Sequence, residues 1–260
     1  DIVEEIARIY GYEKIPNILP ATSIPVYQFG NDLKFEDDIR DVLSGAGFIE
    51  LFTYSMIGER ELKSAFLTED DVIKIDNPIS ADFIFLRREL GSTTLKAYAE
   101  NETREEELAF FEISNIYLPV SSGDLPKEQS TLVIAFNNRT PEKAFLKVKG
   151  AVELLAKKLG IEENLLKFLP AQLTPFYQKG SSAKIEGIGE IGLASNESLN
   201  IAGAKIPVAV AQINVASLLA LKNSSQKKFK PIPEFPVAVR DLAFFINAST
   251  IWDEVKTEVI

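Results

Sequence analysis

The sequence predicts an α+β fold in which a mainly antiparallel sheet is flanked by helices. About seven segments have a strand pattern and five or six have a helix pattern, and they do not alternate regularly as in parallel α/β folds. The clearest helix spans 141–159, with Thr140 as its N-cap, Pro141 at its first position and Gly160 at its end. The clearest strands are apolar stretches bounded by turns, at 108–118, 131–136, 183–195 and 205–215.

The first half of the chain mixes shorter elements. An amphipathic helix opens the chain and stops at Gly11, and a second helix at 32–46 keeps Phe35 and Ile39 on its apolar side. The next run, GFIELFTYSMI at 47–57, is rich in aromatic and β-branched residues and predicts one long strand. The pattern then predicts a short helix at 59–66, a strand at 72–75 and a longer helix at 86–103.

These elements predict where the core lies. We expect residues from about 25 to 220 to form one antiparallel-centred sheet, which the helices at 32–46, 86–103 and 141–159 cover. The side chains expected to be buried are Phe35, Ile39, Phe52, Phe111, Val148, Val152 and Leu155.

Length and composition exclude several functions. A chain of 260 residues with 46% hydrophobic and 25% charged residues has enough material for one or two folded domains. The net charge of −10 disfavours a stand-alone nucleic-acid binder, because an acidic surface repels phosphates. The absence of Cys and His excludes disulfides, thiol catalysis, serine–histidine triads and ordinary zinc sites. Chemistry would therefore depend on carboxylates, Lys, Arg, Tyr, hydroxyls or an oxygen-bound metal.

The ends of the chain suggest an intracellular, cytoplasmic fragment of a longer protein. No apolar run approaches the roughly 18 residues of a membrane span, and the N-terminus does not resemble a signal peptide. The Lys-rich, Pro-terminated stretch at 222–230 predicts a domain boundary. Beyond it, residues 235–260 predict one strand and one helix capped near Ser249 or Thr250, which is the start of a further domain.

A glycine motif at Gly187–Gly192 matches the G-x-G-x-x-G pattern of dinucleotide-binding folds. That function requires a helix that opens directly on the glycines, and the residues after Gly192 predict no sustained helix. The flanking residues alternate as in β-strands. The motif therefore favours a tight β-hairpin over a nucleotide site.

Three carboxylates in the first helix form the candidate metal site. Asp1, Glu4 and Glu5 share one helical face, and oxygen ligands of this kind suit Mg²⁺. The alternative is structural, because acidic residues in a first turn favour the helix dipole and Glu4 and Arg8 are spaced as an ion pair. Other charge runs, at Glu36–Asp41 and Glu105–Glu107, are typical of solvated surface.

Several stretches, in one order along nearly the whole chain, carry a family resemblance. They are DIVEEIARIYGYEKIP at 1–16, GFIELFTYSMI at 47–57, NPIS followed by FLRREL at 77–90, FFEISNIY at 110–117, FLKVKGAVELLAKKLG at 145–160, SSAKIEGIGEIG at 181–192 and FPVAVRDLAFFI at 235–246. Together they resemble the beta chain of bacterial phenylalanyl-tRNA synthetase.

The resemblance implies a domain plan and a set of partners. Residues 1–20 would be the end of a helical DNA-binding-like domain with its linker, 21–226 an inactive module like a class II aminoacyl-tRNA synthetase core, and 227–260 the truncated start of a ferredoxin-like anticodon-binding domain. The family works as an α₂β₂ assembly that charges tRNA(Phe) with phenylalanine. Its alpha chain activates the amino acid with ATP, and its beta module packs against alpha.

The resemblance also bears on the two candidate sites. A working class II site holds ATP phosphates with Arg residues, and neither FFEISNIYL at 110–118 nor the hairpin at 187–192 supplies one, so we predict no catalytic residue in this chain. The family's Mg²⁺ pattern ends in D-x-x-E-E, which Asp1, Glu4 and Glu5 match. An earlier Asp of that pattern would precede residue 1, and the alpha chain completes the site, so the predicted site is incomplete here.

The leading hypothesis is thus a non-catalytic, architectural part of phenylalanine–tRNA ligase. The helix at 32–46 and the strand after it are expected to contact the alpha chain, because such elements build dimer interfaces in class II synthetases. The alternatives are a free-standing carboxylate-dependent hydrolase, such as a glycoside hydrolase, and a synthetase-derived adaptor protein.

Overall fold

The computed structural model describes residues 1–19, 21–23, 30–120, 125–224, 235–236, 238–247, 250, 255 and 258–259. The chain divides into two compact units, Asp1–Gln226 and Lys227–Ile260. The helices of the first unit are α1 (Ile2–Tyr10), α2 (Asn31–Gly45), α3 (Glu59–Ser64), α4 (Gly91–Asn101), α5 (Pro141–Leu159), α6 (Asn196–Ala202) and α7 (Val215–Ser224), with 3₁₀ turns at Tyr12–Lys14, Glu69–Asp71 and Glu163–Leu165.

Two sheets account for the strands of this unit. The strands are β1 (Ile49–Glu50), β2 (Met56–Ile57), β3 (Ile73–Lys74), β4 (Phe85–Leu86), β5 (Ala109–Leu118), β6 (Lys127–Asn137), β7 (Phe168–Pro170), β8 (Tyr177–Ile185), β9 (Gly189–Ala194) and β10 (Val208–Asn214). Seven of them form a sheet in the order β1-β5-β6-β10-β9-β8-β7, and β2-β4-β3 form a small second sheet. In the larger sheet β1 and β5 run parallel, and the other neighbours run antiparallel. The predicted α+β fold with a mainly antiparallel sheet is therefore confirmed, although the strands form two sheets rather than one.

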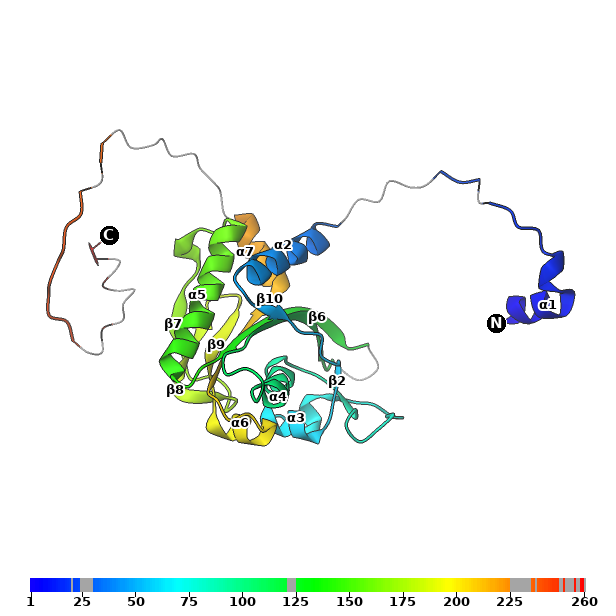
Figure 1. The fold of residues 1–260 in the computed structure, drawn as a ribbon, viewed down its shortest axis with the longest axis horizontal. Helices are drawn as coiled ribbons and strands as arrows, with labels where there is room; N and C mark the ends of the chain where they lie inside the picture. Colours follow the sequence, from blue (N-terminus) through cyan, green and yellow to red (C-terminus); the bar gives the residue numbers. More distant parts are fainter. Residues whose placement is uncertain are drawn as a thin grey trace. The chain divides into compact units, whose positions relative to one another are not determined.

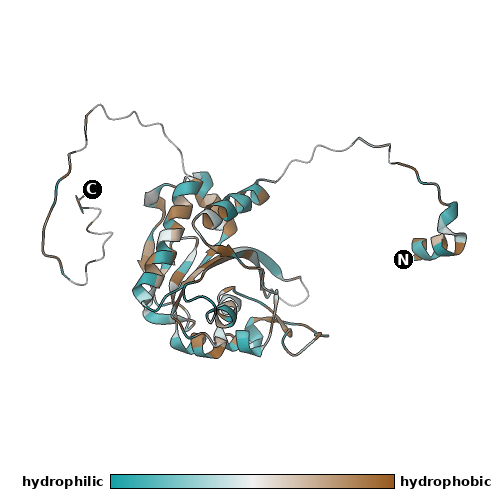
Figure 2. Ribbon diagram, in the orientation of Figure 1, coloured by the Kyte–Doolittle hydropathy of each residue, from teal (hydrophilic) through white to brown (hydrophobic). Residues whose placement is uncertain are grey.

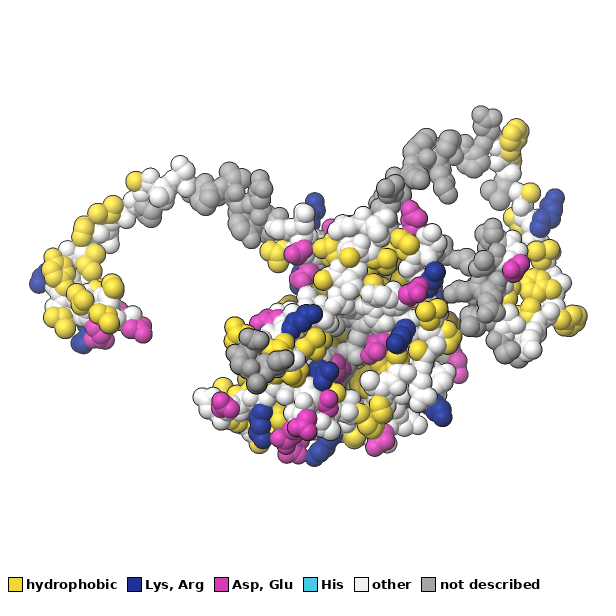
Figure 3. Space-filling view, turned by 180° about the vertical axis from the view of Figure 1, so that it is seen from behind, with side chains coloured by type: hydrophobic (Ala, Val, Ile, Leu, Met, Phe, Trp, Pro, Cys, Tyr) yellow, Lys and Arg dark blue, Asp and Glu magenta, His cyan; other side chains and the backbone are white. Residues whose placement is uncertain are grey.

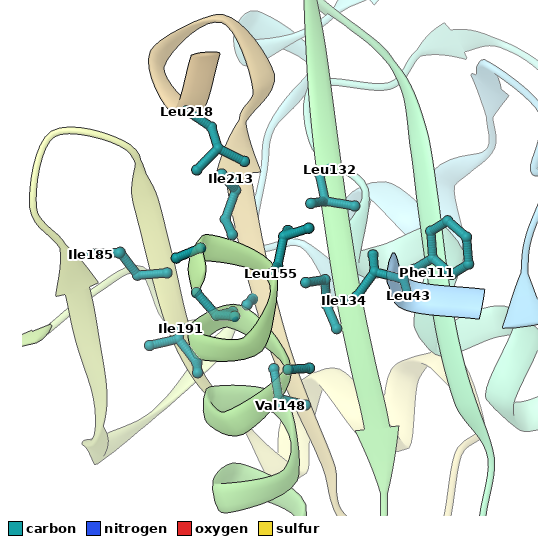
Figure 4. Close-up of a cluster of buried hydrophobic side chains, with 14 of the residues drawn as sticks. Leu43, Phe111, Leu132, Ile134, Val148, Leu155, Ile185, Ile191, Ile213 and Leu218 are labelled. Carbon is teal, nitrogen blue, oxygen red and sulfur yellow. The ribbon is translucent and has the colours of Figure 1, made fainter. Parts of the chain in front are cut away.

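Helices cover both faces of the large sheet (Figure 1). On one face α2, α5 and α7 pack on Phe111, Ile134 and Ile213, and Figure 4 shows α5 lying across this layer. On the other face α4 and α6 pack on the alternate residues of the same strands, among them Phe110 and Val210. Because both faces are buried, the central strands contain continuous apolar runs, at 132–136 in β6 and 208–211 in β10 (Figure 2).

Helix α5 follows from its sequence as predicted. Thr140 is its N-cap, Pro141 occupies the first turn, and Gly160 ends it in a left-handed conformation at φ 81°. Val148, Val152 and Leu155 are buried, as are Phe35, Ile39 and Phe111 from the predicted core list. These six burial predictions are confirmed.

Two predictions in the first half of the chain are wrong. The run at 47–57 is not one long strand, because only Ile49–Glu50 and Met56–Ile57 pair as strands, each in a different sheet. Phe52, which was expected in the core, is 87% exposed. The chain leaves the large sheet after β1, so the side chain of Phe52 has no covering layer.

Other boundaries shift for local reasons. Helix α4 begins at Gly91 rather than near residue 86, because Phe85–Leu86 pair as β4 and Glu89 caps the helix. A short helix, α6, follows the hairpin where no sustained helix was predicted. Residues 238–247 contain no strand, and Ser249, near the predicted helix cap, lies outside the described residues, as does most of the Lys-rich stretch at 222–230.

The glycine motif forms a hairpin between β8 and β9, as predicted. Gly187 turns the chain at φ 74°, a conformation that L side chains rarely adopt. Gly189 lies against the neighbouring strand, where a Cβ would come 2.1 Å from the carbonyl oxygen of Gln212. Both glycines therefore serve the hairpin and its packing on β10.

Candidate functional site

The strongest candidate site is the edge of the large sheet at β1. Ile49 and Glu50 pair with Phe110 and Phe111 of β5, and β1 is the end strand of the sheet. The amide of Leu51 continues the pairing with a hydrogen bond of 2.7 Å to the carbonyl oxygen of Phe111. From there residues 51–55 form no regular strand, and Thr53 contacts β5 through the side chain of Glu112.

Alternate side chains of this edge segment, residues 51–55, point to opposite sides. Phe52 is 87% exposed and Tyr54 is 69% exposed, whereas Thr53 between them is half-buried. Ile49 of β1 is also exposed, and the ring of Tyr54 lies against that of Phe83, with 5.1 Å between centroids. The edge therefore presents neighbouring apolar side chains to solvent, which marks a candidate interaction surface.

Beneath the edge segment lies a buried ion pair that the sequence did not reveal. Arg87 Nη1 lies 3.0 Å from Glu112 Oε1, and both side chains are excluded from solvent. Arg87 also donates from Nε to the carbonyl oxygen of Asn115 at 3.0 Å and from Nη2 to the Ser114 hydroxyl. Such a pair is stable only when its remaining donors and acceptors are satisfied.

Thr53 completes this buried network. Its amide donates to Glu112 Oε1 at 3.2 Å and its hydroxyl donates to Glu112 Oε2 at 2.7 Å. The same hydroxyl accepts a hydrogen bond of 2.7 Å from Arg87 Nη1. The backbone amide of Arg87 in turn donates to the carbonyl oxygen of Ser55 at 2.9 Å. Side chains from the core thus hold the edge segment where regular strand pairing ends.

Helix α2 is joined to β1 by Arg40. Its guanidinium contacts Glu50 at 2.9 Å and Asp37 at 3.1 Å, and Glu36 accepts a hydrogen bond from Ser130 on β6. Part of the acidic run at Glu36–Asp41 therefore fixes the helix to the sheet rather than serving only as solvated surface. On the face seen in Figure 3, acidic, basic and hydrophobic side chains are interspersed.

A second cluster of buried polar groups lies where α4 meets the sheet. Glu89 accepts hydrogen bonds from the Gly91 amide and from the amide and hydroxyl of Ser92, and burial raises the pKa of its carboxyl. Burial likewise raises the pKa of Glu190, which hydrogen-bonds the Tyr177 hydroxyl. Tyr177 has a pKa well above its ordinary value because of burial and the nearby Glu190 carboxylate. Hydrogen bonds within the protein therefore engage both carboxyl groups: Glu89 bonds Gly91 and Ser92, and Glu190 bonds Tyr177.

An open groove lies between α4 and the loop before β10. Thr103, Arg139 and Lys205 are among its lining residues. The Glu102 carboxylate at its base accepts hydrogen bonds from the amides of Lys205 and Ile206 at 2.9 to 3.2 Å. Because these hydrogen bonds engage Glu102, its carboxylate is not free to act in catalysis.

The predicted metal ligands Asp1, Glu4 and Glu5 all lie on α1 or at its N-cap. Glu5 pairs with Arg8 at 2.5 Å, so the expected pairing of Glu4 with Arg8 does not form. In the described part of the chain no three acidic side chains gather closely enough to hold a metal ion. The donors suit Mg²⁺ in chemistry, but their arrangement here does not make a site by itself.

The architecture is shared with a solved aminoacyl-tRNA synthetase. A solved pyrrolysyl-tRNA synthetase from Desulfitobacterium hafniense superposes with a TM-score of 0.62 at 15% identity, over 75% of this chain and 71% of that one. The fold is therefore that of a class II aminoacyl-tRNA synthetase catalytic core.

The family is narrower than this class. Residues 15–215 match the family described as the phenylalanyl tRNA synthetase beta chain CLM domain, and the chain belongs to that family. Similar proteins include phenylalanine–tRNA ligase beta subunits from Clostridium acetobutylicum, at 26% identity over 100% of this chain, and from Dehalococcoides mccartyi strain 195, at 30% over 100%. A Listeria innocua beta subunit is 30% identical over 96% of this chain. The chain spans about a third of the length of these relatives, covering 33%, 33% and 32% of them respectively.

Proposed function

We propose that this chain is a non-catalytic, architectural part of a phenylalanine–tRNA ligase beta subunit and that it docks on the catalytic alpha subunit. The exposure of Phe52 and Tyr54 beside β1, at the edge of the sheet, is the main support for this proposal. Apolar side chains gathered at an open edge are costly in water and are typical of interfaces between permanent subunits. The family membership supports the alpha subunit of the same ligase as the partner, in an assembly that we take to be α₂β₂.

In this assembly the alpha subunit activates phenylalanine with ATP and the enzyme charges tRNA(Phe). The present chain contributes support rather than chemistry. Strand β5 and the β8–β9 hairpin carry no Arg that could hold nucleotide phosphates, and Arg87 is committed to Glu112 inside the core. No helix in the described residues is long and apolar enough to cross a membrane, and we place the enzyme in the cytoplasm.

A carboxylate-dependent hydrolase is supported less well. Such an enzyme needs two carboxyl groups that face a substrate, one of them as acid and the other as base or nucleophile. Among the described residues, desolvation raises the pKa of the carboxyl groups of Glu89 and Glu190, and both are engaged by neighbouring groups of the protein. Hydrogen bonds to Gly91 and Ser92 occupy Glu89 as a helix cap.

We also propose that this chain contributes ligands to a Mg²⁺ site. In the full assembly Asp1, Glu4 and Glu5 supply carboxylate ligands, and the missing ligands come from outside this chain. Glu4→Ala together with Glu5→Ala is expected to lower the metal content of the purified assembly, measured by elemental analysis. The matched control is Glu13→Ala, which removes an exposed carboxylate just after α1. Equal metal content in the double variant and the wild type would show that Glu4 and Glu5 are not metal ligands.

Hydrogen–deuterium exchange tests the docking proposal. The full-length beta subunit is compared alone and mixed with the alpha subunit of the same organism. We expect residues 49–55 to become protected in the complex, whereas the exposed face of α5 around Leu146 should not change. A complex that leaves residues 49–55 unprotected would show that the interface lies elsewhere.

A further inference from the structure

We propose that Thr53, together with the buried Arg87–Glu112 pair, positions the edge segment so that Phe52 and Tyr54 face the partner subunit. The inference rests on the proposed function and deepens it, because it assigns the affinity of docking to contacts inside the core. Neither Arg87 nor Glu112 is accessible to a partner, so both act through Thr53 and are positioning residues.

The edge segment is not held by the backbone pairing of a regular strand. A regular strand would be held by repeated backbone pairing with β5, but that pairing ends at Leu51. At Thr53 the side chain of Glu112 takes the place of a backbone acceptor and receives the amide at 3.2 Å. Side-chain contacts therefore set the conformation of the backbone on either side of Thr53.

Successive side chains of the edge segment alternate in direction. Successive side chains of an extended chain point to opposite sides, so a residue that is fixed inward turns both of its neighbours outward. Thr53 is fixed inward by two hydrogen bonds to Glu112 and one from Arg87. The exposure of Phe52 and Tyr54 follows from that fixation.

The Thr53 hydroxyl hydrogen-bonds to both charged groups. It accepts from Arg87 Nη1 and donates to Glu112 Oε2, each at 2.7 Å. A methyl group in its place would leave both charged groups short of a partner, and unsatisfied buried charges rearrange their surroundings. The edge segment is the part free to rearrange, because β5 is paired along its length with β6.

The test uses Thr53→Val in the full-length beta subunit, with binding to the alpha subunit measured by titration. We expect the Kd to rise about tenfold or more, because the segment loses its inward hydrogen bonds. Thr53→Ser, which keeps the hydroxyl, should stay within about twofold of the wild type. The matched control is Thr131→Val, at a buried threonine on β6 whose hydroxyl hydrogen-bonds to Gln129.

Hydrogen exchange of the free subunit gives the second readout. The amide of residue 53 should exchange faster in Thr53→Val, and that of Thr53→Ser should match the wild type. If Thr53→Val binds as well as Thr131→Val while Phe52→Asp weakens binding, the positioning role is wrong and the docking surface stands. If the wild-type subunit does not bind the alpha subunit at all, the proposed function itself fails.

Discussion

Arg87 and Glu112 form an ion pair within the core, with 3.0 Å between Nη1 and Oε1, although they come from different parts of the chain. Arg87 follows β4 of the small sheet, and Glu112 lies in the middle of β5 of the large sheet. The pair therefore joins the two sheets beneath the proposed docking edge.

Removal of one partner of this pair should be costly. Arg87→Met leaves the Glu112 carboxylate buried without its counter-charge, and we expect the free energy of unfolding to fall by about 3–5 kcal/mol. Arg87→Met combined with Glu112→Leu should recover much of that loss, because neither charge remains. Urea unfolding of the wild type and the two variants measures both changes. A double variant as unstable as Arg87→Met would contradict this account.

The half-buried carboxyl of Glu190 predicts a pH dependence of stability. Burial raises its pKa in the folded state, so the protonated form is favoured by folding. The resulting contribution to stability is complete below the ordinary glutamate pKa and is lost as the pH rises through the raised value. Glu190→Gln should therefore be more stable than the wild type near pH 8, and the difference should shrink towards about pH 4.

The control for this measurement is Glu105→Gln, which removes an exposed carboxylate from the loop before β5. Its unfolding free energy should follow that of the wild type across the same range. A Glu190→Gln variant that is less stable at the upper end of the range would mean that the carboxylate is stabilised by its neighbours.

Two glycines should respond in opposite ways to alanine. Gly189→Ala places a Cβ 2.1 Å from the Gln212 carbonyl oxygen, so β9 and β10 must separate and the chain should be destabilised. Gly150→Ala in α5 places its Cβ in open space and should stabilise by about 0.5–1 kcal/mol, since glycine weakens a helix. Thermal unfolding of both variants tests the pair. Similar shifts in both would mean that the close approach at Gly189 is relieved without cost.

The chain by itself is expected to support no phenylalanine-dependent exchange of pyrophosphate into ATP. A working class II site holds the ATP phosphates with Arg side chains, and β5 and the β8–β9 hairpin offer no Arg. The assay measures exchange with a purified preparation and with an alpha-subunit preparation as the positive reference. Exchange above background that a point mutation in this chain abolishes would show an active site.

The sequence predicted α5 and the central strands well because local and tertiary preferences agree there. Apolar residues at helical spacing, Pro141 and Gly160 define α5, and continuous apolar runs define strands that are covered on both faces. The hairpin at 187–192 was likewise correctly predicted from the alternation on both sides of its glycines.

The sequence could not predict where the sheet ends. Phe52 has the pattern of a buried strand residue, and its exposure depends on the chain leaving the large sheet after Glu50. The Arg87–Glu112 pair was missed for a similar reason, because charged residues are normally assigned to the surface and the burial of both comes from the meeting of two sheets. The available signal was an Arg that directly follows the apolar pair Phe85–Leu86.

The apolar edge at Phe52 is proposed to bind the alpha subunit. The most direct measurement is the Kd of the full-length beta subunit for alpha with Phe52→Asp, compared with Leu146→Asp at an exposed position on α5. We predict that Phe52→Asp weakens binding by about a hundredfold or more, because a charge would be buried at the interface, and that Leu146→Asp has little effect. Wild-type affinity in Phe52→Asp would contradict the claim.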